Sequence, residues 1–160
     1  MTFPVAIALG SNLGKRTAHL DWAVGQLRGL VFPSGGLLVS SYIETAPEGG
    51  APQPDFLNAA VVGHTPLAPR ALLEQLLAIE TERGRVRSKS GGPAAPRELD
   101  LDLILYGSSV IDEPGLTVPH PRFRTRAFVL KPLAEIAPSW IDPGTGKSIA
   151  DLARSLSSTH

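Results

Sequence analysis

Arg97-Glu98-Leu99-Asp100-Leu101-Asp102-Leu103-Ile104-Leu105-Tyr106 is the stretch that decides the fold. Leucine occupies every second position from 99 to 105, and this alternation is the period of a half-buried β-strand. On such a strand Asp100 and Asp102 share one face, about 6.6 Å apart along the chain. Two interpretations remain open at this point. The strand has a solvated polar face, or its carboxylate pair serves two metal ions about 3.5–4 Å apart.

Two basic segments flank this strand in the sequence and favour the second interpretation. Residues 83–97 and 122–131 contain nine of the fifteen Lys and Arg residues and no Asp or Glu. Carboxylates bind Mg²⁺, while guanidinium groups bind the phosphate oxygens that the metal leaves uncovered. The combination predicts a site for Mg²⁺ and a nucleotide.

The composition restricts the class of protein. At 160 residues, with a formal net charge of zero, we expect one domain over residues 1–160 that binds a small polyanion and neither nucleic acid nor membrane. Cysteine is absent, which excludes disulfides and thiolate metal sites from the chain. No apolar run reaches the length of a membrane span, and the N-terminus does not resemble a signal peptide. We therefore expect a cytoplasmic protein and, as a default, a monomer.

The remaining periodic segments indicate an α+β fold. The order strand, helix, strand, strand, helix, strand is that of a ferredoxin-like βαββαβ sandwich, in which helices cover one face of an antiparallel sheet. A C-terminal extension follows it. The other face of the sheet is then available for ligands. The expected strands are 5–9, 37–43, 56–62 and 99–106, with a hairpin at 110–118; the expected helices follow Asn12 and Pro69 and cover 127–136 and 149–156.

Two short patterns near the expected strands have a structural and a functional interpretation. Gly10 and the Gly14-Lys15 pair resemble a phosphate-binding loop, but their spacing is one residue too short and Arg16 replaces the metal-binding hydroxyl. A turn with a helix cap at Ser11 or Asn12 explains them better. Phe56 and Asn58 offer a ring and an amide to a flat heterocycle, or form an ordinary core ring beside a turn residue.

Several motifs in order along the chain resemble one family. They are Ala8-Leu9-Gly10-Ser11-Asn12-Leu13, Gln53-Pro54-Asp55-Phe56-Leu57-Asn58-Ala59-Ala60, Ile79-Glu80, Gly84-Arg85-Val86-Arg87, Pro96-Arg97-Glu98-Leu99-Asp100-Leu101-Asp102, Leu116-Thr117-Val118-Pro119-His120-Pro121 and Arg126-Ala127-Phe128 with Pro132-Leu133. The chain thereby resembles the 6-hydroxymethyl-7,8-dihydropterin pyrophosphokinases of folate biosynthesis.

The resemblance implies transfer of the β,γ-diphosphate of ATP to the hydroxymethyl group of a reduced pterin, with release of AMP. Asp100 and Asp102 would bind two Mg²⁺ ions and, with Arg85 and Arg97, form the catalytic set. The nucleotide would contact Glu80, Arg85, Arg87, Arg97, Leu103, Leu116, Thr117, His120 and Arg126. The pterin would lie between Phe56 and Phe128, with its edge near Asn58, Thr45, Ala46, Pro47 and Glu48.

Departures from the family pattern fall on the expected loops. Ala94-Ala95 stand where many members carry an aromatic residue, Pro121 stands where Tyr is common, and Gly115 where a basic residue is common. We expect the Gly/Pro-rich loops 46–54 and 88–96 to close over the substrates. The alternative function is a non-catalytic ferredoxin-like module that binds RNA or a regulatory nucleotide, although the chain has few aromatic residues for that role.

Overall fold

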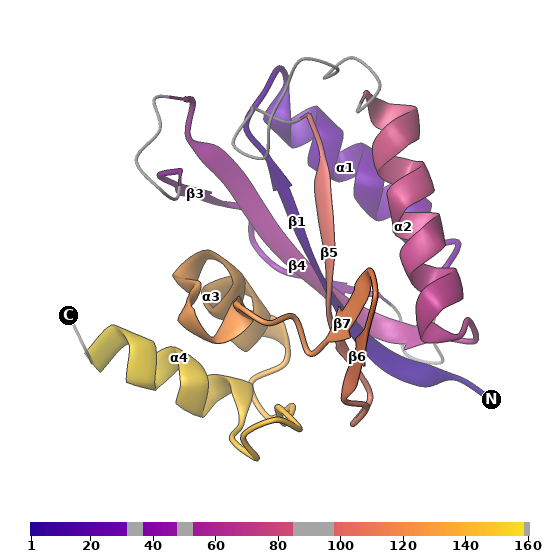
Figure 1. The fold of residues 1–160 in the computed structure, drawn as a ribbon. Coiled ribbons are helices and arrows are strands. Elements are labelled where there is room, and N and C mark those ends of the chain that lie inside the picture. Colours follow the sequence, from indigo (N-terminus) through magenta and orange to yellow (C-terminus); the bar gives the residue numbers. More distant parts are fainter. Residues whose placement is uncertain (32–36, 48–52, 85–97, 159–160) are drawn as a thin grey trace.

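The aspartate stretch forms an edge strand of a five-stranded antiparallel sheet, as the alternation predicts (Figure 1). The computed structural model describes residues 1–31, 37–47, 53–84 and 98–158. Strand order in the sheet is β2-β4-β1-β5, and β3 also pairs with β4. The elements are β1 (Phe3–Ser11), α1 (Arg16–Leu27), β2 (Leu38–Val39), β3 (Ile43–Thr45), β4 (Phe56–Thr65), α2 (Pro69–Arg83), β5 (Asp100–Tyr106), β6 (Ile111–Glu113), β7 (Leu116–Val118), the 3-10 helix η3 (Phe123–Thr125), α3 (Ala127–Ile136) and α4 (Ile149–Ser158).

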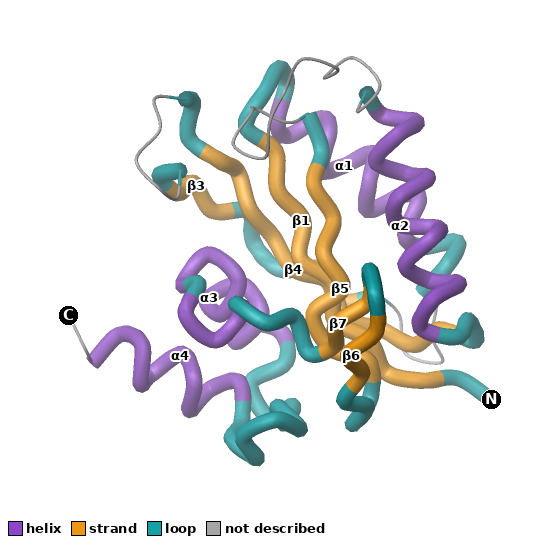
Figure 2. Tube along the Cα trace, in the orientation of Figure 1, coloured by secondary structure: helices purple, strands orange, loops and turns teal. Residues whose placement is uncertain are grey.

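The two faces of the sheet carry separate hydrophobic cores, which gives the ferredoxin-like sandwich a further layer (Figure 2). α1 and α2 cover one face, where alternate residues of β1, β4 and β5 are buried. The C-terminal extension, α3 and α4, packs on the other face. The prediction of helices on one face holds for α1 and α2, and the face expected to carry ligands is in fact partly covered. The second core contains Ala6, Ala8, Ala60, Val62, Ile104, Leu105, Phe123, Val129, Leu130, Leu133, Ala137, Ile149 and Leu152.

The predicted alternation along β5 holds for its first half and fails at its end. The register between β1 and β5 shifts between Ala6 and Ile7, which pair with Leu105 and Leu103. Ile104 is therefore the extra residue of a β-bulge, which changes the face of the residues that follow it. Leu105 packs with Ile104 in the second core, and Tyr106 joins the first. A bulge has no signature in an alternating run of leucines, so the sequence prediction was wrong there.

Two further details of the sequence prediction also need correction. The single strand expected at 37–43 is divided into β2 and β3, because the Ser40 hydroxyl accepts a hydrogen bond from Ala60 N–H at 2.9 Å in place of a backbone partner. The helix cap expected at Ser11 or Asn12 is absent, since Ser11 ends β1 and Lys15 precedes α1 without a side-chain cap. Among the described residues, no helix is long and apolar enough to cross a membrane.

Candidate active site

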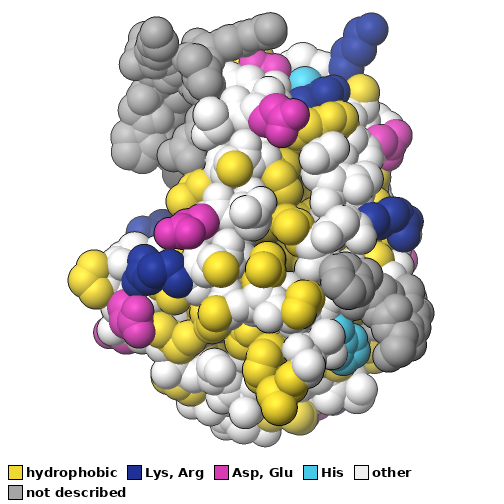
Figure 3. All heavy atoms as spheres, turned by 90° about the vertical axis from the view of Figure 1, so that its right-hand side faces the viewer, with side chains coloured by type: hydrophobic (Ala, Val, Ile, Leu, Met, Phe, Trp, Pro, Cys, Tyr) yellow, Lys and Arg dark blue, Asp and Glu magenta, His cyan; other side chains and the backbone are white. Residues whose placement is uncertain are grey.

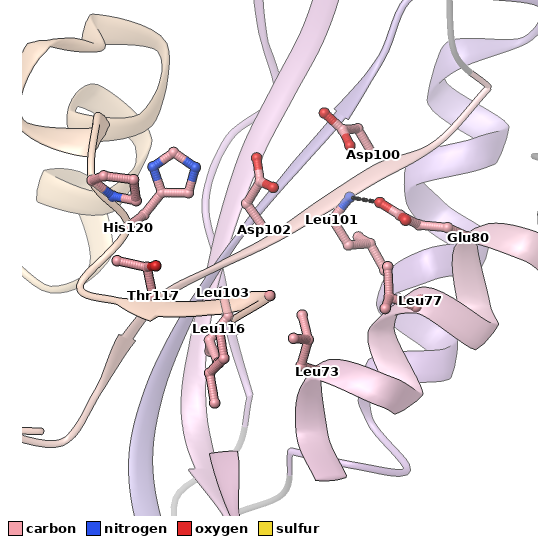
Figure 4. A pocket seen from close by; sticks show the side chains of 12 residues that line it. Leu73, Leu77, Glu80, Asp100, Leu101, Asp102, Leu103, Leu116, Thr117 and His120 are labelled. Carbon is pink, nitrogen blue, oxygen red and sulfur yellow. Dashed lines mark hydrogen bonds between the residues drawn. The ribbon is translucent and has the colours of Figure 1, made fainter. Parts of the chain in front are cut away.

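A cavity of about 340 Å³ lies where β5, α2 and the β6–β7 hairpin meet (Figure 4). Its wall is apolar on the side of α2, while carboxylates and an imidazole stand along its other edge. The hairpin reaches this position because β7 packs beside β5. Such a mixture of an apolar wall and a few polar groups is typical of a small-molecule site. The lining residues are Leu73, Leu77, Glu80, Asp100, Leu101, Asp102, Leu103, Gly115, Leu116, Thr117, His120 and Pro121.

Asp100 and Asp102 point to the same side of β5, as the strand period predicts (Figure 4). Both side chains are half-buried, and the leucines between and after them are buried against α2. Within the described residues, no group of three or more His, Asp or Glu side chains could hold a metal ion together. Any Mg²⁺ bound by this carboxylate pair would therefore complete its octahedral shell with ligand oxygens and water, which is how this ion is commonly held beside phosphates.

Glu80 fixes the strand between these two carboxylates. Its side chain is 3% exposed, and its Oε2 accepts a hydrogen bond of 2.6 Å from Leu101 N–H. That N–H belongs to an edge strand and points away from β1, so without Glu80 a buried donor would lose this acceptor. The sequence comparison assigned Glu80 to the nucleotide. The structure places it in the cavity wall, where it connects α2 to β5.

The absence of a side chain at Gly10 lets Asn58 and Phe56 pack close to β1, on the strand next to β5. Gly10 pairs with Asn58 on β4 and with Asp100 on β5, so the three residues form one row across the sheet. A Cβ on Gly10 would lie 2.9 Å from Asn58 Oδ1 and 3.6 Å from Phe56 Cδ1. Phe56 and Asn58 therefore face the same side as Gly10, as the strand period predicts.

The Asn58 amide is oriented by a neighbouring strand. Asn58 Nδ2 donates a hydrogen bond of 2.5 Å to the Thr45 hydroxyl of β3, and Asn58 is buried. Asn12 Nδ2 donates to Gln53 Oε1 at 2.8 Å and to the Pro54 carbonyl at 3.2 Å, which ties the end of β1 to the segment before β4. Thr45, Ala46 and Pro47 follow one another from β3 onward. Glu48, and with it most of the loop 46–54 that we expect to close over the substrates, lies outside the described residues.

Phe128 and Arg126 stand at the start of α3, which borders the sheet face that carries Asn58. The Arg126 guanidinium lies 5.4 Å from the centre of the Phe128 ring, within cation–π distance. Both residues are half-buried. The structure thus places one predicted phosphate-binding arginine in contact with one predicted pterin-stacking ring.

Two hydrogen bonds hold His120 at the edge of the cavity, one through its backbone and one through its ring. His120 N–H donates to the Ile104 carbonyl at 3.0 Å, and His120 Nδ1 accepts from Arg122 N–H at 3.1 Å. Since Nδ1 is the acceptor, the proton of the neutral ring is on Nε2. Leu103 and Leu116 are buried in the cavity wall, and Thr117 is exposed at its edge.

The basic residues of the two acid-free segments divide into different roles. Arg124 makes two hydrogen bonds to the fully buried Asp142, at 2.5 and 2.8 Å, and so belongs to the packing of the C-terminal extension. Arg83 donates to His19 and stacks on Trp22, within the other helical layer. Arg85, Arg87 and Arg97, together with the loop 88–96, lie outside the described residues.

Several residues of the cavity wall were not among the predicted site residues, including Leu101 of β5 and two leucines of α2. Leu73 and Leu77 of α2 line the cavity, and Leu77 is 41% exposed although Leu72 and Leu76 are fully buried. On the α2 side of the molecule, hydrophobic side chains gather in the middle of the surface, with charged side chains toward the margins (Figure 3). The signal was the width of the apolar stripe on α2, which exceeds what the core covers.

Proteins of known name are similar to this chain over most of its length. The chain is 42% identical over 153 residues to the 2-amino-4-hydroxy-6-hydroxymethyldihydropteridine pyrophosphokinase of Synechocystis, covering 96% of this chain and 76% of that protein. It is 44% identical over 135 residues to the enzyme of the same name from Pseudomonas aeruginosa, covering 84% and 80%.

Solved structures share the fold of this chain. A crystal structure of Plasmodium falciparum HPPK-DHPS superposes with a TM-score of 0.76 at 13% identity, covering 99% of this chain and 45% of that one. This chain thus spans less than half of that longer protein. The sequence model of one family, "7,8-dihydro-6-hydroxymethylpterin-pyrophosphokinase (HPPK)", matches residues 6–138. The chain therefore belongs to the 7,8-dihydro-6-hydroxymethylpterin-pyrophosphokinase family.

Proposed function

We propose that this chain transfers the β,γ-diphosphate of ATP to the hydroxymethyl oxygen of 6-hydroxymethyl-7,8-dihydropterin, giving the pterin diphosphate and AMP. The observation that carries the proposal is the row Asn58–Gly10–Asp100, which sets a buried amide and a half-buried carboxylate on one face of the sheet, on either side of a glycine. Two strand spacings separate them, about 9–10 Å. A flat bicyclic ring bound at Asn58 can thus extend its hydroxymethyl group toward Asp100.

Two Mg²⁺ ions are the metal complement that we propose for Asp100 and Asp102. The donor set fits this ion, since it consists of hard carboxylate oxygens and has too few protein ligands for a closed site. Bound there, the ions would supply charge neutralisation for the phosphate oxygens. The half-burial of both carboxylates supports the assignment, because it places them at the cavity edge rather than in bulk solvent.

The nucleotide base is assigned to the apolar part of the cavity. Leu73 and Leu77 of α2 face Leu103 and Leu116 across it (Figure 4). Thr117 is placed at the rim for a polar contact, and His120 Nε2–H for a donor contact to a phosphate or ribose oxygen.

The pterin and the remaining phosphate contacts are assigned to the other side of the aspartates. Phe56 and Phe128 are proposed to stack on the ring, while Asn58 and the backbone from Thr45 to Pro47, continuing to Glu48, bind its edge. Arg85, Arg87, Arg97 and Arg126 are proposed for the triphosphate, where an arginine on the transferring group can contribute about 10³–10⁵-fold to the rate. We assign no general base, since a hydroxyl positioned for in-line attack needs mainly orientation.

Product analysis tests the proposal. With ATP, Mg²⁺ and the reduced pterin alcohol, the protein is expected to release AMP only when all three are present. ADP as the nucleotide product, or ATP turnover that does not depend on the pterin, would contradict it. Salt-sensitive RNA binding without AMP release would instead favour the RNA-binding alternative, which family membership opposes.

A further inference from the structure

A buried polar cluster lies outside the cavity, on the α1–α2 side of the sheet. It consists of His19 from α1, Arg83 from the end of α2, and Glu98, two residues before β5; we call it the His19 cluster. Arg83 Nε donates a hydrogen bond of 2.9 Å to His19 Nδ1, and His19 Nε2 lies 3.8 Å from Glu98 Oε2. His19 is 8% exposed, so these contacts are largely withdrawn from water.

The proton arrangement in the cluster is determined by these contacts. Since His19 Nδ1 accepts from Arg83, the ring proton is on Nε2, on the side of Glu98. Burial and the charge of Arg83 lower the pKa of His19, against the opposite effects of Glu98 and the Leu13 carbonyl. The fold thus favours the neutral imidazole, which accepts a hydrogen bond from Arg83 and has its Nε2 facing the Glu98 carboxylate.

Two glycines show how closely the chain packs around this cluster. Gly84 has φ +148°, and a Cβ there would lie 2.5 Å from the Glu98 carboxyl carbon. Gly14 has φ +74°, and a Cβ there would lie 3.1 Å from His19 Nε2. Glu98 therefore packs directly on Gly84, and His19 packs on the turn between β1 and α1. The Arg83 guanidinium also covers Trp22, 5.0 Å from the ring centre.

The cluster joins two points of the chain that are adjacent to proposed functional residues. Gly84 immediately precedes Arg85, and Glu98 immediately follows Arg97 and lies two residues before Asp100. We propose that His19 is a positioning residue for the diphosphate transfer, acting through Arg83 and Glu98 to fix the first residues of β5 and the residues Gly84 and Glu98, which adjoin Arg85 and Arg97 in the sequence. This inference rests on the proposed function, because it assumes the phosphate roles of these arginines.

Kinetics of matched variants test the inference. His19→Ala removes the acceptor for Arg83 and the ring that faces Glu98. We expect kcat to fall about 10-fold, less than the roughly 100-fold that a misplacement of 1 Å in an active site can cost. KM for ATP is expected to rise, while KM for the pterin changes little. His19→Gln retains an acceptor and a donor and should restore most of the loss. Arg83→Gln should reproduce part of it and be less than additive with His19→Ala.

A second buried ion pair provides the control. Arg124→Gln removes a cation from the buried Asp142 in the C-terminal extension, far from the His19 cluster in the fold. We expect this variant to lower Tm and to leave kcat and both KM values within about 2-fold at a temperature well below Tm. The positioning role is wrong if His19→Ala changes only Tm, as we expect of Arg124→Gln. It is also wrong if His19→Gln fails to restore kcat and the KM for ATP.

The order of the measurements separates this inference from the proposed function. Pterin-dependent AMP release by the unaltered chain is measured first, and its absence would count against the proposed function alone. Equilibrium binding of a non-hydrolysable ATP analogue with Mg²⁺ is then measured for the same variants. Weaker binding by His19→Ala, restored in His19→Gln, supports the positioning role in either case. Equal binding by all variants contradicts it.

Discussion

Two ends of one sheet face differ in what covers them. At one end Ala6, Ala8, Ala60 and Val62 lie under α3, which fills the space above these small side chains. At the other, open end, outside that core, the same face carries Gly10 of β1, Asn58 of β4 and Asp100 of β5. The register between β1 and β4 is continuous from one end to the other, while β5 has its bulge between them. Small apolar residues allow a helix to pack, and glycine allows the Asn58 amide to lie close against β1.

Loss of either aspartate is expected to have the largest effect at the open end. Asp100→Asn and Asp102→Asn remove a metal-binding charge from half-buried positions, so we expect pterin-dependent AMP release to fall by at least about 100-fold. The thermal unfolding midpoint should change little, because neither substitution alters side-chain volume. Steady-state kinetics and calorimetry on the same samples check this. Activity that survives both substitutions would show that this end is no metal site.

Truncation at the covered end should do the opposite. Leu130 of α3 is fully buried in the second core, and Leu130→Ala is expected to lower the free energy of unfolding by about 2–5 kcal/mol. Urea titration measures that loss. KM for both substrates should remain near the original values at a temperature where the variant is folded. A specific rise in KM for the pterin would mean that the two ends are not separate in function.

A single methyl group at Gly10 tests whether the position of the Asn58 amide matters for binding of the pterin. Gly10→Ala places a Cβ against Asn58 Oδ1, and we expect binding of the pterin to weaken about 10-fold through displacement of that amide. Ala8→Gly, two residues earlier on the same face, is the matched control. It should reduce stability slightly and leave pterin affinity unchanged. Calorimetric titration with the pterin in the presence of an ATP analogue measures both.

Acid should destabilise the His19 cluster and the Arg124–Asp142 ion pair in different pH ranges. The pKa of His19 is below 6.5, owing to burial and Arg83, so the fold favours the neutral form. Its contribution is complete above pH 6.5 and is lost as the pH falls below that value. Burial acts to raise the pKa of Asp142, but hydrogen bonds from Arg124, Thr145 and Gly144 outweigh it and keep the pKa below 3.8. That contribution is complete above pH 3.8 and is lost at lower pH.

Melting temperatures between about pH 7.5 and 3 can resolve these two ranges. The difference in Tm between the unaltered chain and His19→Gln should shrink as the pH falls below 6.5. The difference from Asp142→Asn should stay constant there and shrink only below 3.8. A His19→Gln difference that is independent of pH would contradict a neutral imidazole in the cluster.

Local patterns predicted the fold because each one depends on the period of a single element. The alternation at Leu99, Asp100 and Leu101 correctly placed the carboxylates on one face. Pro69 correctly marked the start of α2. The bulge at Ile104 was not predictable, because it depends on pairing with β1. The cover by α3 depends equally on tertiary packing.

The site was predictable only where its residues have a chemical signature. Asp102, Asn58 and His120 stood out by type, and the structure brings Asp102 and His120 to one cavity. The other contributors either lack a side chain or contact a residue that is distant in the sequence. Gly10 acts by lacking a side chain, and His19 meets Glu98 across 79 positions of the chain. A sequence pattern within one element does not reveal such contacts.

The fate of the β-phosphorus is the most direct test of the central claim, that the open end of the sheet presents this atom to the pterin alcohol. ATP labelled at the β-phosphorus is incubated with Mg²⁺, the pterin and the chain, and the products are separated. The account predicts that the label appears in the pterin diphosphate and that the AMP is unlabelled. Label recovered in ADP would contradict it, because the alcohol would then have attacked the γ-phosphorus.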